Sequence, residues 1–129
     1  MLIYICCSGG ATSSFFCSKI VKEASEQNIL VDHILAIIKN YKELEKQYDF
    51  ILAYGPVSLI APADIREYHL DQAIDMVLIA PQVRYMKDAV QNQLAPYNIS
   101  VSVIDMKTFG AMKGTAALAD IRALIAKIQ

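Results

Sequence analysis

The chain has 129 residues, of which 55% are hydrophobic, and its 12 basic and 13 acidic side chains give a formal net charge of -1. This length suits one domain with one core over residues 1–129, and the balanced charge, without a stripe of lysine or arginine, argues against nucleic acid as a partner. The most apolar region, residues 50–63, contains two prolines and a glycine and is shorter than the ~20 residues that a membrane-spanning helix needs.

The cysteines and the start of the chain indicate the compartment. Three cysteines without C-x-x-C spacing argue against a disulfide framework and for a reducing cytoplasm. The chain begins directly in a strand-like run, with no basic flank or cleavage site, so we expect no secretion signal and a cytoplasmic protein. No histidines and cysteines have the spacing of a zinc site, and we predict neither a metal nor another cofactor.

The first residues predict a strand, a turn and a helix in immediate succession. A strand-favouring apolar run over residues 2–7 is followed by glycines and hydroxyl residues. From Phe16 onward apolar residues recur at helical spacing, with lysines and glutamates on the other side. This pattern predicts an amphipathic helix from Ser13 or Ser14 to about Gln27.

The middle of the chain is less regular. Residues 29–38 are mostly apolar and β-branched and predict a second strand, and the charged residues 39–48 fit a short exposed helix. Residues 49–54 predict a third strand, ended by Gly55 and Pro56. A short helix over residues 63–70 is plausible.

The remaining elements alternate regularly. We expect, in order, a strand over residues 75–80 ended by Pro81, a helix over residues 83–95, a strand over residues 99–104, a loop over residues 105–114 and a final helix capped by Thr115. Strands alternating with helices predict an α/β fold with three layers, in which helices flank a parallel sheet of four or five strands, as in flavodoxin-like proteins. The segments DFILAYGPV and DMVLIAPQV look alike; we interpret them as two similar proline-terminated strands rather than as a duplication.

Cys7 is the candidate nucleophile because it is the last residue before the glycine-containing turn. A thiolate at a helix amino terminus has a lowered pKa, and the same place favours a bound anion. Cys6 and Cys17 fall where periodicity points inward, and we interpret them as small buried hydrophobes. The backbone N–H groups and hydroxyls of the following loop can cradle a phosphate, so the candidate phosphate-binding residues are Ser8, Gly9, Gly10, Ala11, Thr12, Ser13 and Ser14.

Other polar residues follow later strands and are candidates for the same site. Gln82, Tyr85 and Asp105 follow predicted strands and form a possible rim at the same sheet edge, although a surface turn is the better interpretation of Gln82 and Tyr85, and Asp105 fits either a ligand contact or a loop cap. We interpret His33 and His69 as ordinary structural or exposed residues.

A cysteine before a phosphate loop also describes the low-molecular-weight tyrosine phosphatases. Their pattern places an arginine six positions after the cysteine, where its guanidinium holds the transferring group. That position is Ser13 here, and the first arginine in the chain is Arg66. Hydrolysis is therefore disfavoured, and a carrier that holds a phosphoryl group and passes it on is favoured.

Three stretches together resemble a known family: ICCSGGATSS, DMVLIAPQVRYM and VSVIDMKTFGAMKG. They are similar to the cytoplasmic IIB components of the bacterial sugar phosphotransferase system, lactose/cellobiose type. The resemblance implies a phosphotransferase in which Cys7 is phosphorylated and residues 8–14 bind the phosphate. It also implies a phosphohistidine IIA partner as donor and a membrane IIC permease that presents the accepting sugar, a β-disaccharide such as cellobiose or lactose.

The chain departs from the family pattern over residues 40–74, which are longer than the family's link between its second and third strands. We expect DFILAY to be an added strand beside the sheet. Two alternatives to the carrier remain: a non-catalytic IIB-like regulatory module, and a thiol-based phosphatase or reductase.

Overall fold

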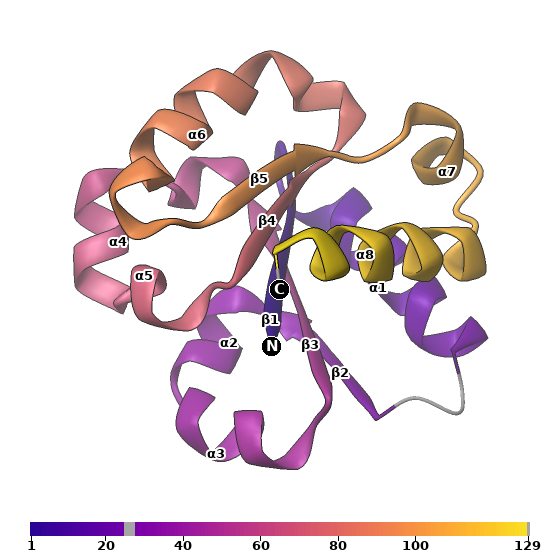
Figure 1. The fold of residues 1–129 in the computed structure, drawn as a ribbon, viewed down its shortest axis with the longest axis horizontal. Coiled ribbons are helices and arrows are strands. Elements are labelled where there is room, and N and C mark those ends of the chain that lie inside the picture. Colours follow the sequence, from indigo (N-terminus) through magenta and orange to yellow (C-terminus); the bar gives the residue numbers. More distant parts are fainter. Residues whose placement is uncertain (25–27, 129) are drawn as a thin grey trace.

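The central feature of the protein, in a computed structural model that describes residues 1–24 and 28–128, is a parallel five-stranded sheet (Figure 1). Its strands, in sequence order, are β1 (Leu2–Cys7), β2 (Ile29–His33), β3 (Phe50–Pro56), β4 (Met76–Ile79) and β5 (Ser100–Val103). They lie side by side in the order β2-β3-β1-β4-β5, and every neighbouring pair is parallel. The predicted α/β fold with a flanked parallel sheet is confirmed.

Helices cover both faces of the sheet and complete three layers. One face carries α1 (Ala11–Glu23) and α8 (Gly114–Ile128), which pack against each other, with α7 (Met106–Gly110) beside them (Figure 1). The other helical elements are α2 (Ile34–Ile38), α3 (Tyr41–Gln47), η1 (Val57–Leu59), α4 (Pro62–Tyr68), α5 (Leu70–Ala73), η2 (Pro81–Met86), α6 (Lys87–Leu94) and η3 (Ala95–Tyr97). In the part of the chain that the structure describes, no helix is long and apolar enough to cross a membrane.

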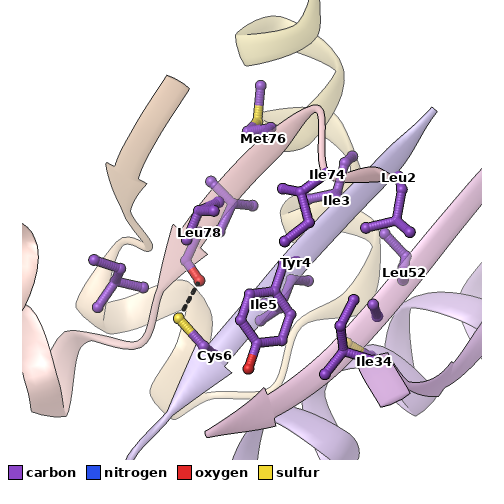
Figure 2. Packing of buried hydrophobic residues seen from close by; sticks show 14 of the residues in the cluster. Leu2, Ile3, Tyr4, Ile5, Cys6, Ile34, Leu52, Ile74, Met76 and Leu78 are labelled. Carbon is purple, nitrogen blue, oxygen red and sulfur yellow. Dashed lines mark hydrogen bonds between the residues drawn. The ribbon is translucent and has the colours of Figure 1, made fainter. Parts of the chain in front are cut away.

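Strand β1 is the centre of the core. All six of its residues are buried, because β3 and β4 pair with its two edges while helices cover its two faces. Figure 2 shows this packing, with the Cys6 thiol directed at the Leu78 carbonyl of β4, 3.7 Å away. Apolar side chains on both faces explain why residues 2–7 form an unbroken hydrophobic run.

The prediction of one strand over residues 29–38 is wrong in its second half. The strand ends at His33, whose Nδ1 accepts a hydrogen bond of 3.1 Å from the Leu35 N–H. This cap satisfies one of the free amides at the start of α2. Ile34 and Ile37 are then buried as one face of a short helix, so apolar β-branched residues alone did not distinguish a strand from a helical turn.

Strand β3 differs from the expectation in two ways. It continues through Gly55 and Pro56, which pair with Cys6 and Cys7 of β1 instead of ending the strand. It also lies within the sheet, between β1 and β2, and not beside it. Strand β3 therefore separates β2 from β1.

Smaller boundaries also differ. Helix α1 begins at Ala11, two or three residues before the predicted start, and the predicted end at Gln27 lies outside the described residues. The predicted helix over residues 63–70 is broken at His69, which has a φ of 53°. Residues 83–95 begin as a 3-10 turn before α6, and the predicted loop over residues 105–114 contains α7.

The two helices on one face meet at Gly114, where α8 begins. A β-carbon there would fall on the Lys19 carbonyl and within 2.8 Å of Glu23 Oε2. The Glu23 carboxylate also accepts hydrogen bonds from the Thr115 N–H at 2.7 Å and the Thr115 hydroxyl at 3.1 Å. Thr115 therefore fixes α8 to α1, and its predicted role as the cap of the final helix is wrong.

We expect Gly114→Ala to lower the free energy of unfolding by about 2 kcal/mol, because the backbone of α1 must move to admit a methyl group. Urea unfolding followed by circular dichroism measures this change. The matched control is Gly110→Ala in α7, where an added β-carbon meets nothing within 4 Å. Equal stability of the two variants would contradict the close approach of α1 and α8.

Candidate functional site

The candidate site lies where β1 ends and α1 begins. Cys7 is the last residue of β1, and Gly10 caps α1 in a left-handed conformation, with φ 92° and ψ -20°. A side chain would be strained at this φ and would also meet Gly55, whose Cα lies 3.3 Å from the position of an added β-carbon. Only glycine lets the chain turn here within so little space.

This turn brings a backbone N–H and a hydroxyl group to the Cys7 sulfur. The Gly10 N–H donates to Sγ at 3.0 Å, and the Ser13 hydroxyl lies 3.3 Å from the same sulfur. Ser13 is fully buried, and its hydroxyl also donates to the Gly10 carbonyl at 3.1 Å. The Ser13 hydroxyl has one proton, so it accepts from a neutral thiol while bonded to the carbonyl and donates to a thiolate only after turning away from it.

The three cysteines have different acidities because their surroundings differ. Burial acts to raise the pKa of Cys7, but hydrogen bonds from the Ser13 hydroxyl and from the backbone of Ser13, Gly10 and Gly9 outweigh it and leave the pKa below that of an ordinary thiol. Burial raises the pKa of Cys6 to about 12, with a further contribution from Cys7. Burial likewise raises the pKa of Cys17. Cys7 is thus the most acidic of the three thiols, and only the thiolate form of a cysteine is nucleophilic.

The other residues of the predicted phosphate loop differ in exposure. Ser8, Gly9, Ala11 and Thr12 are exposed, Ser14 is half-buried, and Cys7 itself is 5% exposed. The Ser14 N–H donates to the Gly10 carbonyl at 3.0 Å, which is the first bond of the helix. The amides of residues 11–13 precede this bond at the start of the helix, where N–H groups can serve an anion, and the Ser13 amide already donates to the Cys7 sulfur.

The three predicted rim residues lie at the same edge of the sheet, after β4 and β5. Gln82 is exposed and Tyr85 is 78% exposed. Asp105 Oδ2 accepts from the Thr108 N–H at 3.0 Å and from its hydroxyl at 3.2 Å, and these bonds lower the pKa of Asp105. Asp105 thus caps α7. Within residues 1–24 and 28–128 the structure shows no hydrogen bond between these three side chains and Cys7.

The two histidines have surroundings unrelated to the candidate nucleophile. His33 caps α2 and packs edge-on against Tyr54, with ring centroids 5.7 Å apart. His69 is exposed between α4 and α5. Across the described ranges, no three His, Cys, Asp or Glu side chains are grouped closely enough to hold a metal ion.

Sequence reasoning missed the part of the site that β3 supplies. Gly55 and Pro56 lie against Gly10, although 45 positions separate Gly10 from Gly55 in the sequence. The Gly-Pro pair was visible in the sequence, but it indicated only the end of a strand. Its place beside Cys7 follows from the pairing of β3 with β1.

The chain is similar to the PTS system oligo-beta-mannoside-specific EIIB component of Bacillus subtilis (strain 168), with 44% identity over 43 residues. The matched segment makes up 33% of this chain and 42% of that relative. No family model matches the chain. The predicted resemblance to IIB components is confirmed by this partial match.

We expect Ser13→Ala to raise the pKa of Cys7, because it removes a donor that stabilises the thiolate. Loss of one hydrogen bond to a charged group lowers the thiolate fraction at neutral pH by about ten-fold. The rate of iodoacetamide modification, measured against pH, should therefore reach its midpoint at a higher pH than in the unmodified protein.

One control variant accompanies this measurement. Ser18→Ala removes an exposed hydroxyl from the same helix and should leave the midpoint in place. Because folding lowers the pKa of Cys7, its thiolate stabilises the folded state at pH values above the pKa of an unfolded thiol. This stabilisation is lost as the pH falls through the pKa of Cys7 in the folded state. A midpoint in Ser13→Ala identical to that of Ser18→Ala would show that Ser13 does not tune the thiol.

Proposed function

We propose that the protein is a IIB-type carrier of a sugar phosphotransferase system, with Cys7 as the residue that is phosphorylated. The observation that carries this proposal is the 3.0 Å hydrogen bond from the Gly10 N–H to Cys7 Sγ, at the amino terminus of α1. It combines a stabilised thiolate with a place suited to a phosphate dianion. The partial match to an EIIB component supports the same function.

In the first step a IIA partner donates the phosphoryl group. The Cys7 thiolate attacks phosphorus, the P–N bond to the partner's phosphohistidine breaks as the P–S bond forms, and the electron pair returns to the imidazole. Lowering the pKa of Cys7 favours this step, since only the thiolate is nucleophilic. The same lowered pKa makes the thiolate a better leaving group in the second step.

The turn and the first helical residues hold the phosphoryl group between the two steps. The amides of residues 11–13 and the exposed hydroxyls of Ser8 and Thr12 are donors for its oxygens. Ala11 and Gly9 contribute only backbone groups. Because α1 is fixed by α8 on one side and by the sheet on the other, these donors are held in place before the group arrives.

In the second step a sugar bound by a membrane IIC permease accepts the group. A sugar hydroxyl attacks phosphorus, the P–S bond breaks as a P–O bond forms, and the hydroxyl proton is released. We propose a β-linked disaccharide such as cellobiose or lactose as the sugar class. The name of the relative, which specifies oligo-beta-mannosides, supports a β-linked substrate. Residues 1–129 would serve as one IIB-type domain on the cytoplasmic side.

The composition of the loop favours transfer over hydrolysis. The sixth position after Cys7 is Ser13, whose buried hydroxyl bonds to the thiol, and no arginine lies in the loop. The first arginine, Arg66, is an exposed residue of α4. Without a guanidinium to stabilise the transferring group for attack by water, the phosphocysteine should persist until a partner accepts it.

We expect the protein to gain one phosphoryl group when it is incubated with phosphoenolpyruvate, the general phosphotransferase proteins and a IIA partner. Intact-mass spectrometry measures the adduct. Cys7→Ser should abolish it, whereas Cys6→Ser should retain it, because burial keeps Cys6 protonated. Purified protein should release phosphate from an aryl phosphate no faster than Cys7→Ser does.

Each other outcome favours a different function. An adduct that survives Cys7→Ser but not Cys6→Ser would show that Cys6, and not Cys7, is phosphorylated. No adduct with any IIA partner would favour a non-catalytic regulatory module. Aryl phosphate hydrolysis that depends on Cys7 would favour a phosphatase.

A further inference from the structure

We propose that Gly55, at the carboxyl end of the additional strand β3, is a positioning residue that holds Gly10 against the Cys7 thiol. Any effect on phosphotransfer rests on the proposed function. The positioning itself does not, because it is measured through the pKa of the Cys7 thiol. It makes β3 part of the site, although β3 contributes no side chain to Cys7.

The first observation is the close approach of two glycine backbones. An ideal β-carbon on Gly10 would lie 3.3 Å from Gly55 Cα, 3.4 Å from Gly55 C and 3.6 Å from Pro56 N. The left-handed turn at Gly10 therefore rests directly on the Gly55–Pro56 peptide. The space between them is slightly smaller than a β-carbon needs, so a shift of that peptide toward the turn would crowd Gly10 and displace it.

The second observation is that Gly10 joins three interactions of the site. Its N–H donates to Cys7 Sγ at 3.0 Å, and its carbonyl accepts from the Ser13 hydroxyl at 3.1 Å and from the Ser14 N–H at 3.0 Å. Displacement of Gly10 would lengthen the bond that stabilises the thiolate and also move the cap of α1. The geometry of the thiol thus depends on the support beneath Gly10.

The third observation is that Gly55 itself has no freedom on its other side. A β-carbon there would lie 2.8 Å from Tyr4 Oη and 3.1 Å from Ile34 Cγ2. Tyr4 is fully buried, and its hydroxyl donates to the Pro56 carbonyl, which fixes both the ring and the peptide. Tyr4 and Ile34 belong to the packed cluster around β1 (Figure 2). Gly55 is held between this cluster and Gly10.

These contacts predict what a methyl group at Gly55 would do. Tyr4 cannot move away without losing its bond to Pro56, so part of the strain passes to the backbone of Gly55 and from there to Gly10. The Gly10 N–H then no longer meets Cys7 Sγ, while the burial of the thiol remains. A thiol that keeps its burial and loses its donor becomes less acidic.

The test is the pH dependence of Cys7 alkylation in Gly55→Ala. We expect the midpoint to move to higher pH and the rate at neutral pH to fall by about ten-fold, the effect of losing one hydrogen bond to a thiolate. Thermal unfolding shows whether the variant remains folded. The matched control is Gly110→Ala, which has open space around its added β-carbon and should keep the midpoint.

A second pair of variants separates positioning from general loss of packing. Tyr4→Phe removes the hydroxyl that a β-carbon on Gly55 would contact. The double variant Tyr4→Phe/Gly55→Ala should therefore have an alkylation midpoint at lower pH than Gly55→Ala alone. Tyr4→Phe alone frees the Pro56 peptide without adding an atom, and it should raise the midpoint even if Gly55→Ala fails to fold.

The proposal is overturned by a folded Gly55→Ala with an unchanged midpoint, or by an unchanged midpoint in Tyr4→Phe where Gly55→Ala does not fold. Neither result bears on the proposed function, which is judged by the phosphoryl adduct on the unmodified protein. Absence of that adduct would overturn the carrier function and leave the alkylation result as a separate measurement.

Discussion

The positive φ of Gly10 is the constraint on which the candidate site depends. It turns the chain sharply enough for the N–H of Gly10 to meet the sulfur of Cys7 three residues earlier, while its carbonyl starts the hydrogen bonds of α1. A chain that left β1 more gradually would place the thiol and the helix terminus apart. The acidity of Cys7 and the donors available to an anion therefore come from one backbone conformation.

Position alone gives the three cysteines different chemistry. Cys6 and Cys7 are adjacent, but strand geometry points their side chains to opposite faces, and only Cys7 meets the turn. Cys17 lies on the buried face of α1, and its thiol has no charged partner to offset burial. Identical side chains thus differ in acidity through burial and hydrogen bonding.

Much of the fold and the centre of the site could be predicted from local sequence. Apolar runs identified the strands, and the order of strand, glycine turn and hydroxyl residues indicated Cys7 as the candidate nucleophile and residues 8–14 as its loop. Local patterns could not show that residues 34–38 turn into a helix, since this depends on the His33 cap and on burial by the sheet. They also could not place Gly55 under Gly10, because strand order is set by pairing between distant segments.

The insertion of β3 between β1 and β2 also constrains how the chain can fold. Strands β1 and β2 share no ladder, since β2 pairs with β3 and β3 pairs with β1. As the ribosome releases the chain, the first two strands therefore have no partner until residues 50–56 emerge. Strand β2 can pair with β3, and β4 with β5, across shorter connections, but β1 pairs only with β3 and β4, through loops of more than 40 residues. Late pairing of the central strand favours slow folding and leaves the edges of β1 exposed to association with other chains.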